Sequence, residues 1–487
     1  MSKRHSISPL SLVSLSIGFL FGANPIVTGP IASKTAAGDP AHNYPFFSAL
    51  EDLNTRGYVE QEYVYAGTAN HYETPAGATG RVIDGNHPYK TRLLVRRPAD
   101  AKKFNGTVIV EWNNVTSGHD LDIDWYQIHD YLMRSGYAWV GVTTQRVGVE
   151  APKVWNQDRY SSLDVTADRT IMDDALSYDI FADAGRAARE PPGADFLGGL
   201  KPQRAFVTGH SQSALRLAIY VNSVHPLDPV FDAVILHGGG SKVRTDLKIN
   251  VWKLLSETDV IFGQGAARQP DSDHFRSWQV AGSSHVDRQF IASRAKLLSR
   301  DGNPVAPGFT PGVLGSRNSL DAASQVADAK RFTNAIAAGA NPCDLPTYSD
   351  VPFYQVMAAA LDHLVLWVQD GKTPPVAPPI DAISVVPPAV MARDSNGNSL
   401  GGGIRLAALA VPLAVNSGQN TGPGFCWLYG SHVEFDRAKL ASLYPMHAAY
   451  VAAVREVTEK NFKAGYILRP EADATIAAAE HSAVGQR

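Results

Sequence analysis

The chain has 487 residues, of which 44% are hydrophobic, and its formal net charge at pH 7 is −3. This composition can bury a large core, and so small a charge provides no electrostatic attraction to nucleic acid. The length alone would allow several domains, but the strands predicted below follow one another closely enough to form a single sheet.

The N-terminal segment has the order of charge and hydropathy found in secretory signal peptides. Lys3 and Arg4 precede an apolar run, and small residues at 29–37 offer a cleavage site. Serine, asparagine and proline interrupt the run, so removal is favoured over anchoring and no stable membrane insertion is expected. Residues 1–35 are predicted to be a signal peptide of a secreted or periplasmic protein, with an apolar disordered tail as the alternative.

Four segments before residue 145 predict strands of two kinds. Residues 57–67 and 89–97 alternate apolar and polar side chains, as half-solvated antiparallel strands do. Residues 107–112 and 138–143 are almost wholly apolar, which indicates buried central strands.

Three aspartates alternate after the third of these strands, at Asp120, Asp122 and Asp124. They suggest a metal site, but the segment lacks the glycine and the later glutamate of a calcium-binding loop. A solvated or capping role is expected instead, and no metal is predicted.

Residues 204–218 predict a short strand, a sharp turn carrying one serine, and a helix. The turn reads Gly209, His210, Ser211, Gln212 and Ser213, which matches Gly-x-Ser-x-Gly except for serine at its last position. In that motif the serine occupies a strained strand-to-helix bend that leaves its Oγ exposed. Alone, the turn is equally compatible with an ordinary helix start capped by serine.

The next three strands, over 231–239, 249–260 and 274–285, supply an acid and a histidine. The resulting order of serine, acid and histidine is the one that strand–turn–helix serine hydrolases use. A serine hydroxyl needs an imidazole to take its proton, and the imidazole needs a carboxylate to fix its tautomer.

These requirements assign provisional roles to the three side chains. Ser211 is predicted to be the nucleophile, His285 the base and then the acid, and Asp259 the carboxylate that orients His285. Glu257 stands two residues earlier on the same strand end and remains the alternative acid.

The last part of the chain is predicted to add one helix and one disulfide. Residues 352–371 have apolar side chains at helical spacing, and Met357, Leu361 and Leu364 are expected in the core. Cys343 and Cys426 are the only cysteines, and in an exported protein such a pair is usually bridged, the alternative being two buried thiols.

Taken together, the motifs resemble the secreted α/β-hydrolase-domain proteins whose elbow carries Ser-Gln-Ser. The resemblance runs from about Val59 to the C-terminus and rests on VEWNNV, TGHSQSA, SETDV and WQVAGSSHVD. It implies the α/β-hydrolase fold, an eight-stranded, mostly parallel sheet flanked by helices. Residues 36–487 would form a single domain, with an insertion at about 286–350 and a C-terminal extension at about 376–487.

The resemblance also implies an activity and the remaining site residues. It points to a carboxylesterase-like serine hydrolase that cleaves a small-molecule ester through an acyl-enzyme, needs no cofactor, and has no assigned oligomeric state. In this fold the oxyanion hole takes backbone N–H groups from the residue after the nucleophile, Gln212, and from the 113–118 loop, where Asn114 or a neighbour is expected. An amidase, peptidase or acyltransferase with the same triad, or an inactive binding protein, remains the alternative.

Overall fold

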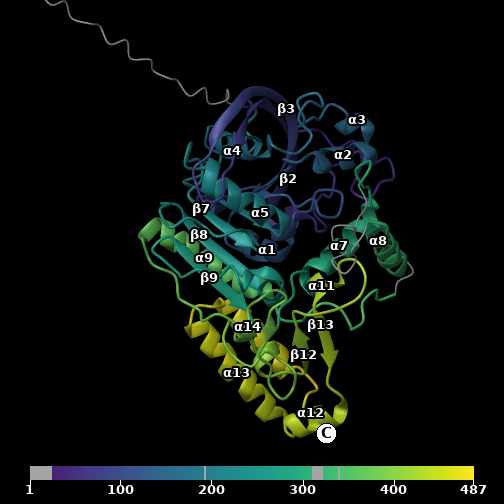
Figure 1. Cartoon of the computed structure of the whole chain (residues 1–487), viewed down its shortest axis with the longest axis vertical. Coiled ribbons are helices and arrows are strands. Elements are labelled where there is room, and N and C mark those ends of the chain that lie inside the picture. The colour runs from purple at the N-terminus through teal and green to yellow at the C-terminus, as the bar shows by residue number, and fades with distance from the viewer. Residues whose placement is uncertain (1–24, 191–192, 310–321, 338–339, 487) are drawn as a thin grey trace, which may run out of the picture.

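A nine-stranded sheet runs through the computed structural model, which describes residues 25–190, 193–309, 322–337 and 340–486 (Figure 1). The strand order is β1-β2-β3-β5-β4-β6-β7-β8-β9. The pairs among β1, β2, β3 and β5 are antiparallel, and all pairs from β5 to β9 are parallel. The strands are β1 (Ile26–Thr28), β2 (Tyr58–Glu73), β3 (Arg81–Pro98), β4 (Thr107–Trp112), β5 (Ala138–Val142), β6 (Arg204–His210), β7 (Ala233–His237), β8 (Asn250–Ser256) and β9 (Phe275–Val280).

The sheet confirms the predicted strands, which correspond to β2 through β9. Strand β1 was not predicted, because its three residues lie inside the segment interpreted as a signal peptide. Val27 pairs with Tyr65 of β2 and is 2% exposed, so this part of the segment belongs to the core. Residues 1–24 of that segment lie outside the described residues.

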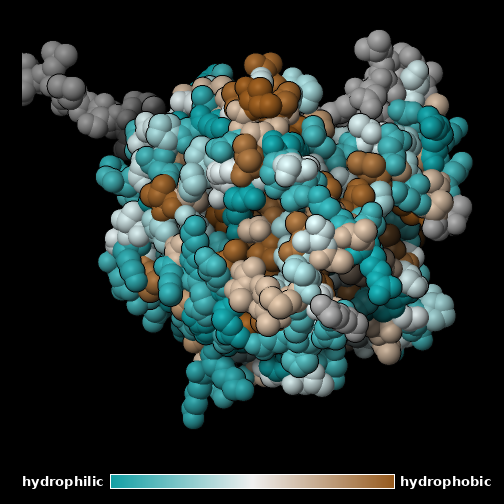
Figure 2. Space-filling model, turned by 90° about the horizontal axis from the view of Figure 1, so that it is seen from below, coloured by the Kyte–Doolittle hydropathy of each residue, from teal (hydrophilic) through white to brown (hydrophobic). Residues whose placement is uncertain are grey.

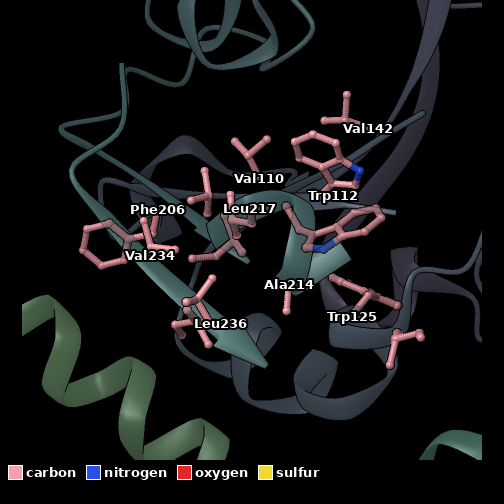
Figure 3. Packing of buried hydrophobic residues seen from close by; sticks show 14 of the residues in the cluster. Val110, Trp112, Trp125, Val142, Phe206, Ala214, Leu217, Val234 and Leu236 are labelled. Atoms are coloured by element: carbon pink, nitrogen blue, oxygen red, sulfur yellow. The ribbon is translucent and has the colours of Figure 1, made fainter. Parts of the chain in front are cut away.

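The central strands are buried because helices cover both faces of the sheet. Every residue of β4, β5 and β7 is buried, and successive strand residues point to opposite faces. Figure 3 shows Val110 and Trp112 of β4 close to Leu217 in the helix that follows the serine turn.

Two groups of helices contact the sheet. Helix α1 packs on α9, and these two reach β5, β6 and β8, whereas α4 and α5 contact β2, β4, β6 and β7. The main helices are α1 (Ile123–Arg134), α2 (Arg146–Trp155), α3 (Gln157–Tyr160), α4 (Ser177–Arg189), α5 (Gln212–Ile219), α6 (Glu257–Asp259), α7 (Arg288–Asp301), α8 (Ala322–Ala337) and α9 (Phe353–Asp370). The helix expected at 352–371 is α9, and its Met357, Leu361 and Leu364 are buried as predicted.

The C-terminal extension lies beside the β9 edge, below the main sheet in Figure 1. It contains two small sheets, β10 with β11 and β12 with β13, and a group of helices. Its elements are β10 (Ala382–Ser384), β11 (Val390–Met391), α10 (Ala407–Ala410), β12 (Ala414–Ser417), α11 (Cys426–Tyr429), β13 (Ser431–Glu434), α12 (Arg437–Leu443), α13 (His447–Lys463) and α14 (Arg469–Glu480).

The surface of this end of the molecule is mainly hydrophilic. Seen from below in Figure 2, apolar side chains form separate patches among polar ones. Within the described ranges, none of the helices combines the length and the hydropathy that a bilayer span requires.

Candidate active site

Ser211 stands at a strained turn between β6 and α5. Its φ of 60° and ψ of −114° fall outside the regions that non-glycine residues usually adopt. Hydrogen bonds fix the turn, because the Ser211 N–H donates to His237 O at 2.8 Å and Leu215 N–H donates to Ser211 O at 3.1 Å. A Cβ on Gly209 would lie 3.1 Å from Ser213 Cβ, so the turn requires small residues on both sides of the serine. Ser213 meets that requirement in place of the usual glycine.

His285 and Asp259 form a buried pair beside Ser211. His285 Nδ1 and Asp259 Oδ1 are 2.6 Å apart, and both side chains are 5% exposed. Asp259 also accepts hydrogen bonds from the backbone N–H and the hydroxyl of Ser256, each at 2.7 Å. Burial alone would raise the pKa of Asp259, but His285 and Ser256 together hold this pKa below its ordinary value. The carboxylate is therefore ionised and oriented toward the imidazole.

Glu257, the alternative acid, lies elsewhere. It is fully buried and forms an ion pair with Arg393 Nη1 at 2.7 Å. It also accepts hydrogen bonds from the N–H groups of Gly282 at 2.8 Å and Gly418 at 3.0 Å, and from the hydroxyl of Ser399. Glu257 thus joins the loop before His285 to the C-terminal extension, and no hydrogen bond connects it to His285.

The two backbone N–H groups expected to form the oxyanion hole differ in whether they are already hydrogen-bonded. Gln212 is the first residue of α5, so the helix itself does not use its backbone N–H. The backbone N–H of Asn114 is already donated to Leu121 O at 3.0 Å, which corrects the choice of this residue as a backbone donor. Its side-chain amide donates instead to His210 O at 2.9 Å and supports the serine turn. In the described part of the chain no acceptor takes the N–H of the next residue, Val115.

Ser211, His285 and Asn114 line one pocket with a volume of about 70 Å³. Its wall is mainly apolar and comes from α1, α7 and the C-terminal extension. The other lining residues are Thr116, Ser117, Leu121, Ile123, His210, Val286, Phe290, Ile291, Arg294, Phe425, Leu428 and Tyr429.

The predicted disulfide is present and supports this wall. Cys343 and Cys426 are bridged, with Cα atoms 5.4 Å apart. Cys426 begins α11, and Phe425, Leu428 and Tyr429 around it face the pocket. The bridge therefore ties one side of the pocket to the segment before α9.

A second buried carboxylate–histidine pair escaped the sequence analysis. His237 Nδ1 lies 2.6 Å from Asp124 Oδ1, and the His237 ring stacks on Phe353 with centroids 4.9 Å apart. His210 stands between the two pairs, its ring centroid 4.3 Å from those of both His237 and His285. The histidine that ends β7 was the only available signal, because its partner comes from a distant helix.

His210 is kept neutral by this arrangement. Burial lowers the pKa of His210 well below its ordinary value, and the neighbouring His285 and His237 lower it further. Among the residues that the structure describes, none makes a hydrogen bond of ordinary geometry with either ring nitrogen of His210. The ring therefore separates the two carboxylate–histidine pairs without carrying charge.

The alternating aspartates each have protein partners, and they do not converge. Asp122 pairs with Arg96 at 2.5 Å, Asp124 holds His237, and Asp120 accepts from Thr143 and Asn113. Across the ranges that the structure describes, no group of three or more histidine, cysteine or acidic side chains is placed to hold a metal ion.

Comparison with known proteins identifies a family. The family model described as an alpha/beta hydrolase domain matches residues 27–477. No curated protein matches the sequence. Among solved structures, the esterase Est22 has 10% identity and a TM-score of 0.31 over 57% of this chain and 84% of that chain. Est1E from Butyrivibrio proteoclasticus has 11% identity and a TM-score of 0.25 over 47% of this chain and 96% of that chain. Scores this low support no inference about activity.

Proposed function

Because the chain belongs to the alpha/beta hydrolase domain family, we propose that it is a serine hydrolase that cleaves carboxylic esters. The observation that carries the proposal is the His285–Asp259 pair, 2.6 Å apart, whose histidine lines the same pocket as the strained Ser211. A nucleophile, a base and an orienting carboxylate are the groups that acyl transfer requires.

The first half of the proposed reaction forms an acyl-enzyme. Asp259 accepts a hydrogen bond from Nδ1–H of His285, which leaves Nε2 free to take the proton of Ser211 as Oγ attacks the ester carbonyl carbon. The N–H of Gln212 stabilises the negative charge on the carbonyl oxygen. As the carbon–oxygen bond to the alcohol breaks, His285 returns its proton to the departing oxygen.

The second half releases the acid. His285 takes a proton from a water molecule, whose oxygen attacks the acyl carbon bound to Ser211 Oγ. Collapse of this second intermediate breaks the bond to Oγ, and His285 then protonates the serine. The wall of the pocket is mainly apolar, which strengthens the interaction between the charge on the intermediate and the fixed donors.

Two alternatives use the same fold. An amidase, peptidase or acyltransferase would keep the triad and change the leaving group or the acceptor. An inactive binding protein would keep the pocket without turnover. The ionised and oriented Asp259 favours an active enzyme, since a binding protein has no need of it.

Labelling with a fluorophosphonate tests the proposal directly. We expect covalent labelling of wild type and of Ser223→Ala, whose hydroxyl donates to backbone oxygens outside the pocket, and none of Ser211→Ala. Turnover of p-nitrophenyl esters should fall by about 10⁴- to 10⁶-fold in Ser211→Ala. Labelling of Ser211→Ala would disprove the assignment, and faster cleavage of p-nitroanilides than of esters would favour the amidase.

A further inference from the structure

One cationic side chain, Arg294 of α7, lines the pocket beside Ser211 and His285. Its guanidinium makes a single hydrogen bond with the described residues, from Nη1 to His119 Nε2 at 3.1 Å. No carboxylate in the described ranges lies within ion-pair distance of it. The other N–H donors of the Arg294 guanidinium have no acceptor among the described residues.

His119 orients Arg294 without neutralising it. The other ring nitrogen of His119 lies 2.7 Å from Pro304 O, so Nδ1 donates and Nε2 accepts. Burial, together with the positive charge of Arg294, lowers the pKa of His119 to about 3. Phe47 contacts the ring edge-on with centroids 5.0 Å apart. The imidazole is therefore a fixed, neutral acceptor that directs the guanidinium.

The surroundings of Arg294 leave it a charged group without a counter-ion. Burial lowers the pKa of Arg294 to about 10, and the nearby phenols of Tyr429 and Tyr348 partly offset this. The group stays protonated at neutral pH. Arg294 is partly buried in a mainly apolar wall, where a guanidinium interacts more strongly with a carboxylate than it would at an exposed site.

We propose that the substrate carries a free carboxylate in addition to its ester group. This carboxylate pairs with Arg294 while Ser211 attacks the ester carbonyl. This inference rests on the proposed esterase function. One guanidinium matches the single charge of a carboxylate and can bind its two oxygens side by side. Arg294 and Ser211 line the same small pocket, so a short spacer between ester and carboxylate is sufficient to reach both.

A pair of esters with equal acyl-chain length tests the inference. 4-Nitrophenyl butyrate is neutral, and mono-4-nitrophenyl succinate ends in a carboxylate. In wild type we expect the succinate ester to have the higher kcat/KM. Arg294→Met should lower the ratio of kcat/KM for the succinate ester to kcat/KM for the butyrate ester by at least about 30-fold, mainly through a higher KM for the succinate ester. Arg294→Lys keeps the positive charge but loses the planar guanidinium. Its kcat/KM for the succinate ester should lie between those of wild type and Arg294→Met.

Arg288→Met is the matched control. Arg288 lies on the same helix, pairs with Asp350 at the surface, and does not line the pocket. We expect its kinetics with both esters to equal those of wild type. 4-Acetoxybenzoate compared with phenyl acetate extends the test to a carboxylate on the alcohol side, and selectivity in either pair supports the inference.

Binding without turnover provides a second readout. Titration of Ser211→Ala with monomethyl succinate should show binding that Ser211→Ala/Arg294→Met lacks. Equal binding by the two proteins, or equal effects of Arg294→Met on neutral and acidic esters, would overturn the carboxylate inference and leave the esterase proposal intact. Absence of both ester cleavage and fluorophosphonate labelling in wild type would instead overturn the esterase proposal, while the titration would still decide whether Arg294 binds a carboxylate.

Discussion

Asp259 and Glu257 are two residues apart and both are buried, yet they contact different partners and therefore have different roles. Asp259 contacts His285, whereas Glu257 contacts Arg393 and two backbone N–H groups. The Asp259–His285 pair takes part in the proposed reaction, because it orients the imidazole that transfers protons. The Glu257 contacts hold the C-terminal extension against the sheet.

Replacing each acid by its amide should separate these effects. We expect Asp259→Asn to lower kcat by about 10⁴-fold, because the amide favours the wrong tautomer of His285, with little change in stability. Glu257→Gln should lower the free energy of unfolding by about 3 kcal/mol, because it leaves Arg393 without its partner, while kcat per folded molecule changes less than tenfold. Steady-state kinetics and urea unfolding measure the two quantities. A larger kinetic loss in Glu257→Gln would reverse the assignment.

The sequence was sufficient to nominate candidate site residues whose roles depend on their position at the end of a strand. Ser211, Asp259 and His285 each follow a recognisable strand, so their order along the chain was sufficient to nominate them. Asn114 could not be resolved, because the partner of its N–H, Leu121, is set by the path of the loop. Arg294 and His119 were missed because they come from separate segments that meet only in the folded chain.

At the scale of elements, hydropathy predicted the strands well and could not predict the contacts between them. Apolar runs placed β4 through β9, and alternation placed β2 and β3, because burial on one or two faces determines those patterns. The three residues of β1 are too short to show a period, and they pair only because β2 offers a free edge.

The contact between β3 and α4 places Asp183 in a crowded acidic cluster. Its carboxylate accepts from Tyr89 and pairs with Arg186, which also pairs with Asp228. Burial, together with repulsion from Asp179, raises the pKa of Asp183 to about 7, although Arg186 opposes the shift. Because the folded-state pKa lies above the ordinary value of 3.8, stability is lost as pH rises from about 4 through about 7.

Asp183→Asn should therefore stabilise the protein at high pH. We expect a gain of about 1–3 kcal/mol in the free energy of unfolding at pH 8, and a smaller gain at pH 5, where the wild-type carboxyl is protonated in the folded state. Urea unfolding at both pH values measures the difference. A gain that is larger at pH 5 than at pH 8 would contradict the assigned pKa.

The bridge between Cys343 and α11 should matter for both stability and activity. It joins residues separated by 83 positions, for which the chain-entropy model gives about 4 kcal/mol. We expect the double variant Cys343→Ala/Cys426→Ala to unfold at lower urea concentration and to have a higher KM, because Phe425 and Leu428 would be held less firmly. Dithiothreitol should reproduce both effects in wild type and neither in the variant. An unchanged wild-type midpoint in dithiothreitol would contradict this expectation.

At the scale of the whole molecule, the N-terminal region constrains where a signal peptide can be removed. Cleavage after residue 35, the predicted end of the signal peptide, would discard β1, whose Val27 is buried, and the hydrogen bond from Ile31 N–H to Glu62 O at 2.7 Å. We now expect a mature N-terminus before Ile26. N-terminal sequencing of protein recovered from its native host measures it, and a mature N-terminus at about residue 36 would contradict it.

Two truncated proteins provide a further check. The protein without residues 1–24 retains β1 and its pairing with β2, and its free energy of unfolding is the reference value. Removal of residues 1–35 should lower it by about 1–3 kcal/mol, because Val27 and the β1–β2 pairing are lost. Equal stability of the two proteins would show that β1 adds nothing to the fold.

The contacts of the C-terminal extension can form only late in synthesis of the chain. A ribosome delivers Ser211, Asp259 and His285 well before it delivers Arg393, Gly418 and Leu428, on which the Glu257 contacts and the pocket wall depend. A nascent chain that already contains all three reactive side chains would still hold an unpaired acid next to an unfinished pocket. We expect such a chain to lack the proposed esterase activity, and we expect products of premature stop codons in about the last hundred residues to be degraded by proteases.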